Sequence, residues 1–142
     1  MKFTIANHNN DRNPKGFINY DVDFIDIPKI ISSGFAYSAS RFIDNYRKND
    51  NWIGGVDLLI LDIDEDCTIE QAKEIFKKYE FYIITTRSHR KLKNDLISDR
   101  FRVFLHLDST INDALTYDNF MKTTVNQYPF IDSKATDKGR FF

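Results

Sequence analysis

Residues 57–66 read Asp-Leu-Leu-Ile-Leu-Asp-Ile-Asp-Glu-Asp, and this stretch decides the fold that we expect. Leu58 to Leu61 form an apolar run without helical spacing, which predicts a short buried strand. Side chains two residues apart on a strand share a face, so Asp62 and Asp64 are expected side by side where the strand ends. Two carboxylates this close repel each other unless a cation lies between them. Because hard oxygen ligands suit Mg²⁺ or Mn²⁺, we predict a divalent-metal site.

Two other interpretations apply to this acidic stretch. Acidic residues directly after a strand are often a solvated turn in an exposed loop. A calcium loop of the EF-hand type also begins Asp-x-Asp-x-Asp, but Cys67 stands where that loop needs glycine, and Lys73 stands where it needs a bidentate glutamate. The choice between a turn and a metal site therefore depends on the rest of the chain.

Length and composition indicate one globular domain. The chain has 142 residues, of which 42% are hydrophobic and 15% aromatic, enough for a single packed core. No apolar run reaches the roughly 20 residues of a membrane span, and the N-terminus lacks the apolar core of a signal peptide. We therefore expect an intracellular protein without membrane contact. The single cysteine excludes an internal disulfide, and no Cys/His spacing of the zinc type occurs.

Periodicity divides the chain into a small N-terminal α/β module over residues 1–55 and a core over residues 56–142. In the module we expect a strand at residues 3–6 and a short helix at 40–48. In the core the expected order is strand, helix, strand, strand, helix, strand, at residues 58–61, 68–79, 81–86, 100–107, 116–128 and 130–132. This is the split βαβ order of an RNA-recognition-motif-like fold, so the predicted fold class is α+β.

One face of the predicted sheet is expected to be open and to collect polar residues. The strand at residues 100–107 alternates, with Arg100 and Arg102 on the face that also carries Asp62 and Asp64. In a split βαβ fold the last strand pairs antiparallel with the first, so Asp132 is expected near these acids. Three carboxylates would then converge. The alternative for the arginines is a solvated sheet face, and for Asp132 it is a turn.

A second polar cluster, Thr-Thr-Arg-Ser-His-Arg-Lys at residues 85–91, follows a predicted strand. Hydroxyls, a histidine and several cations at a strand end can bind phosphate oxygens through charge-assisted hydrogen bonds. A charged surface loop is the alternative. Near the end of the sequence, Arg140 would add positive charge close to Asp132.

Together these motifs resemble those of the archaeo-eukaryotic-type primases that phages and plasmids carry. The motifs are Tyr-Arg-Lys-Asn-Asp-Asn-Trp at residues 46–52, Leu-Asp-Ile-Asp at 61–64, Thr-Thr-Arg-Ser-His at 85–89, Asp-Arg-Phe-Arg-Val at 99–103, and the segment 132–142. The resemblance implies that residues 1–142 form a single primase-like catalytic domain. Such primases usually continue beyond the third acidic motif, so we expect a minimal domain or one half of a split protein.

The resemblance also implies a function, a DNA primase or primase-polymerase of a mobile-element replication system. Two-metal phosphoryl transfer would join an NTP or dNTP to a 3′-hydroxyl on a single-stranded DNA template. The implied catalytic residues and ligands of two Mg²⁺ or Mn²⁺ ions are Asp62, Asp64 and Asp132. The implied contacts to the nucleotide phosphates are Ser88, His89, Arg100, Arg102 and Arg140. The implied location is the cytoplasm of a bacterial host cell, with a replicative helicase or another replication protein as a further option for a partner.

Two alternative functions are considered. A phosphatase similar to the haloacid dehalogenases would use Asp62 as nucleophile and Asp64 as acid/base, with Thr85 or Thr86 as its hydroxyl residue. The sequence pattern of these phosphatases requires Thr or Val two residues after the second aspartate, where this chain has Asp66. A non-catalytic nucleic-acid-binding module of the same fold would instead carry aromatic residues on the exposed sheet face. Only Phe104 is expected there.

Overall fold

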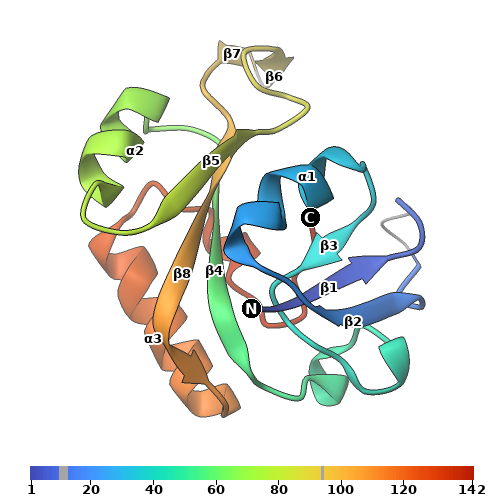
Figure 1. Cartoon of the computed structure of the whole chain (residues 1–142). Coiled ribbons are helices and arrows are strands. Elements are labelled where there is room, and N and C mark those ends of the chain that lie inside the picture. Colours follow the sequence, from blue (N-terminus) through green and yellow to red (C-terminus); the bar gives the residue numbers. More distant parts are fainter. Residues whose placement is uncertain (10–12, 94) are drawn as a thin grey trace.

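Strand β4 (Val56–Ile63) is the central element of the fold and is buried along nearly its whole length. It pairs antiparallel with β8 (Phe101–Ile111), which in turn pairs antiparallel with β5 (Phe81–Thr85), so the core sheet has the order β4-β8-β5. This position accounts for the apolar run at residues 58–61, because a strand covered on both faces has no side exposed to water. The computed structural model describes residues 1–9, 13–93 and 95–142 (Figure 1).

Two helices cover one face of the core sheet. Helix α2 (Ile69–Phe76) begins after Thr68, which exchanges backbone and side-chain hydrogen bonds with Gln71 in the capping box that the sequence predicts. Helix α3 (Ala114–Gln127) is capped by the carboxylate of Asp113. The helices pack on odd-numbered residues of β4 and β8, which are Leu59, Leu61, Ile63, Phe101, Val103 and Leu105.

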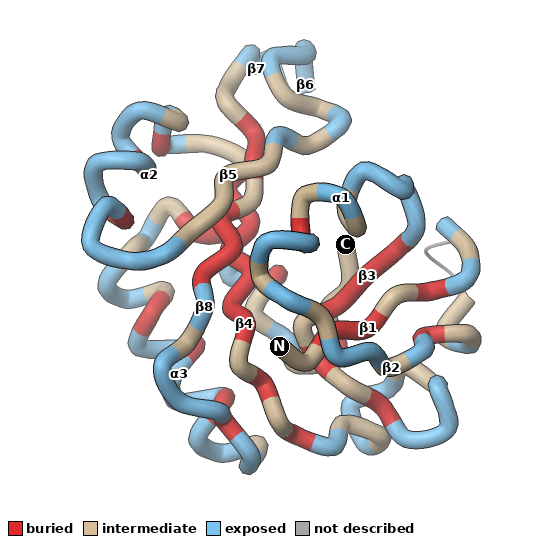
Figure 2. Tube along the Cα trace, in the orientation of Figure 1, coloured by how far each residue is buried: buried red, intermediate tan, exposed pale blue. Residues whose placement is uncertain are grey.

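A smaller sheet covers the other face. Its order is β2-β1-β3, formed by β1 (Lys2–Ala6), β2 (Phe17–Asp21) and β3 (Tyr37–Ser38), with α1 (Ile27–Ser32) packed beside it. The prediction of an open sheet face is therefore wrong, since residues 1–55 fold over it (Figure 2). The second hydrophobic cluster joins the layers through Phe3, Ile27, Tyr37, Leu58, Ile60 and Phe104.

Two predicted elements differ from the structure. Residues 40–48 contain a 3₁₀ turn at Ile43–Asn45 instead of a helix, and Asp44 and Asn45 have positive φ angles that a helix does not allow. Residues 130–132 form a turn instead of a strand. Their apolar character reflects burial of Ile131 in the main core, not strand pairing.

The remaining elements are short. A hairpin of β6 (Leu92–Lys93) and β7 (Leu96–Ile97) stands within the loop predicted at residues 87–99. Further 3₁₀ turns lie at Phe24–Asp26, Asn49–Asn51 and Ser133–Ala135. Within residues 1–9, 13–93 and 95–142, no helix is both long and apolar enough to cross a membrane.

The chain is thus a mixed α+β fold. Strands β4 and β5 are both antiparallel to β8 and lie on either side of it, with α2 connecting them along the chain. This is the split arrangement that the sequence predicts, but without the fourth strand expected at residues 130–132. The core sheet therefore has three strands among the described residues, not the four of a full RNA-recognition-motif-like sheet, and the division of the chain at residue 55 stays a prediction.

Phe104→Ala is expected to lower the free energy of unfolding by about 3–5 kcal/mol. The Phe104 ring is 0% exposed and packs against Tyr37 between the two sheets. Urea denaturation measures the loss. The matched control is Phe120→Ala on α3, where the side chain is 36% exposed and the expected loss is below about 1 kcal/mol. Equal losses in both variants would show that the sheets do not pack as described.

Candidate active site

Asp62 lies near the end of β4, directly opposite Arg102 of β8 in the antiparallel register. Opposed residues of paired strands share a face, and here that face points toward the smaller sheet. The Arg102 Nε donates to Asp62 Oδ1 at 2.9 Å, and an Arg140 nitrogen lies 4.0 Å from Asp62 Oδ2. Asp62 is only 6% exposed. The strand register therefore holds the buried Asp62 carboxylate beside Arg102, and the C-terminal segment adds Arg140.

Burial raises the pKa of the Asp62 carboxyl above its ordinary value, because a desolvated carboxylate is less stable. The positive charge of Arg102 opposes this rise, and the negative charge of Asp64 adds to it. Arg140 lowers the Asp62 pKa by a smaller contribution. The two acids therefore interact electrostatically, as the sequence pattern predicts for residues two positions apart.

Asp64 lies just beyond the end of β4 and is more exposed than Asp62. Its carboxylate pairs with the Lys93 Nζ at 2.8 Å, and its backbone carbonyl accepts a hydrogen bond from the Ser98 hydroxyl at 2.9 Å. Both partners come from the segment around the β6–β7 hairpin. Each of the two acids thus has its own cationic partner, Arg102 for Asp62 and Lys93 for Asp64.

Asp132 lies next to Asp62 through the backbone. The Asp132 N–H donates to the Asp62 carbonyl at 2.9 Å, while the Asp132 carboxylate accepts from the Lys134 N–H at 2.9 Å and caps a 3₁₀ turn. Among the residues that the structure describes, no group of three acidic, histidine or cysteine side chains is arranged to hold a metal ion. The Asp132 backbone therefore lies beside Asp62, as predicted, but the Asp132 carboxylate is hydrogen-bonded to the backbone of its own 3₁₀ turn.

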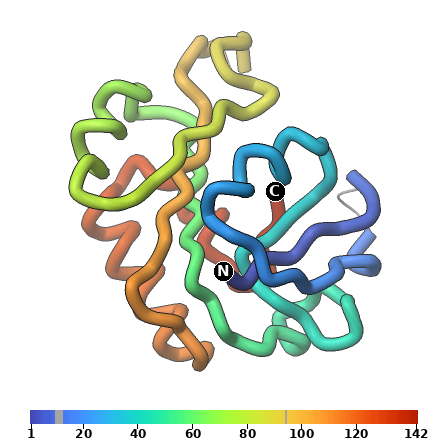
Figure 3. Tube along the Cα trace, in the orientation of Figure 1, coloured from blue at the N-terminus to red at the C-terminus, as the bar shows by residue number. Residues whose placement is uncertain are grey.

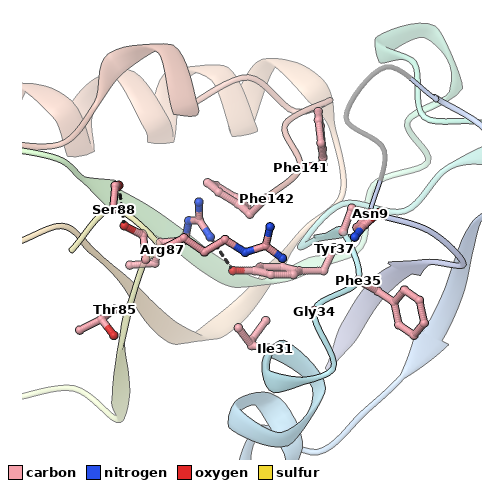
Figure 4. A pocket seen from close by; sticks show the side chains of 13 residues that line it. Asn9, Ile31, Gly34, Phe35, Tyr37, Thr85, Arg87, Ser88, Phe141 and Phe142 are labelled. Carbon is pink, nitrogen blue, oxygen red and sulfur yellow. Dashed lines mark hydrogen bonds between the residues drawn. The ribbon is translucent and has the colours of Figure 1, made fainter. Parts of the chain in front are cut away.

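A pocket of about 440 Å³ opens between the core sheet and the smaller sheet, beside Arg102 (Figure 4). One wall is polar and comes from the end of β5 and the residues after it. The other wall is largely apolar and comes from α1, the segment into β3 and the segment at residues 141–142. The side chains that line it include Thr85, Thr86, Arg87, Ser88, Tyr37 and Phe142.

The first four residues of the motif at residues 85–91 thus line the pocket. Ser88 lines it and lies within hydrogen-bond distance of the Thr86 hydroxyl, at 3.1 Å. His89 is not among the lining residues, and its Nδ1 accepts a hydrogen bond from the Arg100 N–H at 3.2 Å. This acceptor role leaves the proton of a neutral His89 ring on Nε2.

The Arg100 side chain is buried in the protein and does not line the pocket. It is 0% exposed, and its guanidinium donates to the backbone carbonyls of four residues, Ser88, Lys91, Lys93 and Leu96. Arg100 precedes β8, where the strand alternation that places Arg102 no longer applies. Arg100 therefore holds the backbone at these four residues in place. The structure does not support the predicted contact between Arg100 and a nucleotide phosphate.

Two aromatic residues that the sequence analysis did not single out complete the site. Tyr37 and Phe142 exchange backbone hydrogen bonds at 3.0 and 2.8 Å, and Figure 3 shows the C-terminal segment beside β3. The Arg102 guanidinium lies 4.6 Å from the centre of the Phe142 ring and donates to the Tyr37 hydroxyl at 3.0 Å. No local pattern marks these residues, because they meet only through pairing across 105 positions of sequence, from 37 to 142.

Comparison with known proteins supports the fold. No protein-family model matches the chain, and no curated protein matches it in sequence. Among solved structures, the chain is similar to the AEP domain of the primase-polymerase (PrimPol) of cyanophage S-2L, with a TM-score of 0.50 and 9% sequence identity. The alignment covers 99% of this chain and 70% of that chain. At this identity, the likeness shows a shared fold.

Arg102→Gln is expected to raise the pKa of Asp62 further, because it removes the main charge that opposes the effect of burial. Arg140→Gln is expected to raise it less, since that guanidinium lies 4.0 Å away. Carboxyl ¹³C NMR titration of the folded variants measures both. An Asp62 pKa that neither replacement changes would contradict the ion pairs described.

The raised pKa also has a consequence for stability. As the pH falls, the folded chain takes up the Asp62 proton before the unfolded chain does. The contribution of this group to the free energy of unfolding therefore increases as the pH is lowered through the folded-state pKa, and is unfavourable above it. Asp62→Asn is expected to remove this part of the pH dependence, which urea denaturation at several pH values measures.

Proposed function

We propose that the chain is a template-dependent nucleotidyltransferase of the primase-polymerase type. It would join an NTP or dNTP to a 3′-hydroxyl on a single-stranded DNA template. The observation that carries this proposal is the buried Asp62 with Asp64 two residues further on, at the end of a central strand and beside a pocket with hydroxyl and guanidinium groups. The shared fold with a PrimPol AEP domain supports it.

The donor chemistry of the site fits divalent cations. Asp62 and Asp64 offer hard carboxylate oxygens that suit Mg²⁺ or Mn²⁺, and both are paired with cations that a metal ion can replace. Lys93 is exposed, and the Arg102 side chain is 23% exposed, so both have room to turn away. We propose that Asp62 and Asp64 hold the metal, with Asp132 as the third ligand once its carboxylate leaves the cap. When bound, two such ions would stabilise the attacking and leaving oxygens of an in-line displacement.

The cations displaced from the acids would then serve the substrate. Arg102 already lies at the pocket beside Thr86 and Ser88, where its guanidinium can donate to phosphate oxygens. Arg140 is the second such group, held near Asp62 by its stacking over the Phe142 ring at 5.5 Å. The His89 Nε2–H is a further donor of fixed tautomer. In this scheme these side chains bind and orient the triphosphate.

The two alternative functions have less support. A phosphatase of this kind requires Thr or Val two residues after its second aspartate, whereas Asp66 stands there. A non-catalytic module that stacks bases on its sheet requires exposed aromatic rings, whereas Phe104 is 0% exposed. Primer synthesis in phage or plasmid replication, helicase contact and a cytoplasmic location in a bacterial host remain parts of the proposal that rest on the motif resemblance.

Asp62→Asn/Asp64→Asn is expected to abolish nucleotide incorporation, with a loss of at least about 100-fold, because removing groups that stabilise charge in the transition state has effects of this order. The assay incubates single-stranded DNA and mixed nucleotides with Mn²⁺ and follows labelled products on denaturing gels. Asp26→Asn/Asp108→Asn is the control, since both acids are exposed and have no ion pair in the described structure. Hydrolysis of a phosphomonoester that depends on Asp62, without incorporation, would favour the phosphatase instead.

Direct metal binding provides an independent test. Mn²⁺ titration followed by electron paramagnetic resonance is expected to show binding that Asp62→Asn/Asp64→Asn abolishes. Lys93→Gln is expected to tighten binding about two- to fivefold, because it removes the ion pair that competes for Asp64. Lys78→Gln, at an exposed and unpaired lysine of the described chain, is the control. Mn²⁺ affinity that is unchanged in the double variant would refute this metal site.

A further inference from the structure

The β6–β7 hairpin projects from the end of the core sheet and is largely exposed (Figures 1 and 2). In its register Leu92 pairs with Ile97, so these two side chains lie side by side on one face. Leu92 is 69% exposed and Ile97 is 63% exposed. An aliphatic pair this exposed on a projecting ribbon gains nothing for the stability of the isolated chain.

The hairpin is nevertheless firmly attached. The buried guanidinium of Arg100 donates to the carbonyls of Lys91 and Leu96 at 2.7 and 3.1 Å, at both ends of the ribbon. Burying a charged group is costly unless its hydrogen bonds are made. Both terminal nitrogens of the Arg100 guanidinium donate to backbone carbonyls of this segment, whereas its Nε has no hydrogen-bond partner in the described chain. A merely connecting loop does not require such an anchor.

The hairpin is also tied to the candidate active site. Lys93 of β6 pairs with Asp64, and Ser98, directly after β7, donates to the Asp64 carbonyl at 2.9 Å. The aliphatic pair is preceded by Lys91, which is exposed and has no acid within ion-pair distance in the described chain. Arg90, by contrast, is paired with Asp99.

We propose that this hairpin is a contact for the single-stranded nucleic acid that serves as template or primer. The inference rests on the proposed function, since it places the strand beside Asp62 and Asp64. Unstacked bases and sugars would lie on Leu92 and Ile97, and Lys91 would pair with a backbone phosphate. The charge of this segment favours nucleic acid over another ligand, because residues 87–97 carry four cations, Arg87, Arg90, Lys91 and Lys93, against the single acid Asp95.

Leu92→Ser/Ile97→Ser is expected to raise the dissociation constant for a fluorescein-labelled 20-nucleotide single-stranded DNA about tenfold, because it removes apolar area that the bound strand would cover. Fluorescence anisotropy without nucleotide or metal measures it on the full chain. Ile25→Ser/Leu115→Ser is the matched control, since these side chains are 77% and 71% exposed on other elements. Both variants lose only exposed apolar surface, and thermal melting verifies that they are folded.

The phosphate contact has a separate signature. Lys91→Gln is expected to reduce the slope of log Kd against log salt concentration by about 0.7, the value for one phosphate contact on a single strand. Lys78→Gln is expected to leave the slope unchanged. Equal affinity and equal salt slope in the hairpin and control variants would overturn the proposal. So would binding that only anionic lipid vesicles or other proteins show, with no affinity for DNA.

The failure of this inference is distinguishable from failure of the proposed function. Incorporation that needs Asp62, together with DNA binding unaffected by the hairpin variants, would overturn the hairpin contact alone. DNA binding that depends on the hairpin, without any incorporation, would support the contact and overturn the enzymatic proposal. Asp62→Asn/Asp64→Asn is expected to lose incorporation while still binding DNA through the hairpin.

Discussion

The pairing of β4 with β8 is the constraint on which the rest of the structure depends. It sets Leu59 and Leu61 toward the helices and Ile60 toward the smaller sheet, and the same register places Asp62 opposite Arg102. A slip of one residue would move every side chain of β4 to the other face. The hydrophobic core and the candidate active site are therefore specified by one ladder of hydrogen bonds, and neither can shift without the other.

Electrostatic neutralisation shapes the site that this register creates. Buried carboxylates are unfavourable alone, and here Asp62 is offset by Arg102 and Arg140, while Asp64 is offset by Lys93. The same cations are suited to phosphate groups. In the function proposed here, these ion pairs would exchange partners when divalent cations and a triphosphate bind.

The smaller sheet gives the site its second wall. Its β3 strand is joined to Phe142 by backbone hydrogen bonds, and the Tyr37 hydroxyl reaches Arg102 across the interface. The pocket therefore belongs to neither layer alone. Because the smaller sheet covers this face of the core sheet, Phe104 is buried and the face presents no exposed aromatic ring at that position.

Much of the core could be read from local pattern. The run before Asp62, the Thr68–Gln71 cap and the alternation of residues 101–105 each carry their own physical signal, and the structure places all three as expected. Residues 40–48 and 130–132 were misread because their apolar side chains fill the core without a regular element. Arg100 stands just before β8, where strand alternation no longer decides which way a side chain points, so its buried position could not be predicted from the pattern.

The sequence by itself determined the acidic pair at the end of a buried strand and the order of elements around it, because these depend on short-range periodicity and capping. Only the tertiary structure decided which cations neutralise the acids, that Arg100 anchors a hairpin, and that Tyr37 meets Phe142. These contacts join residues far apart in the chain. They form only when the layers pack together, so no local sequence pattern predicts them.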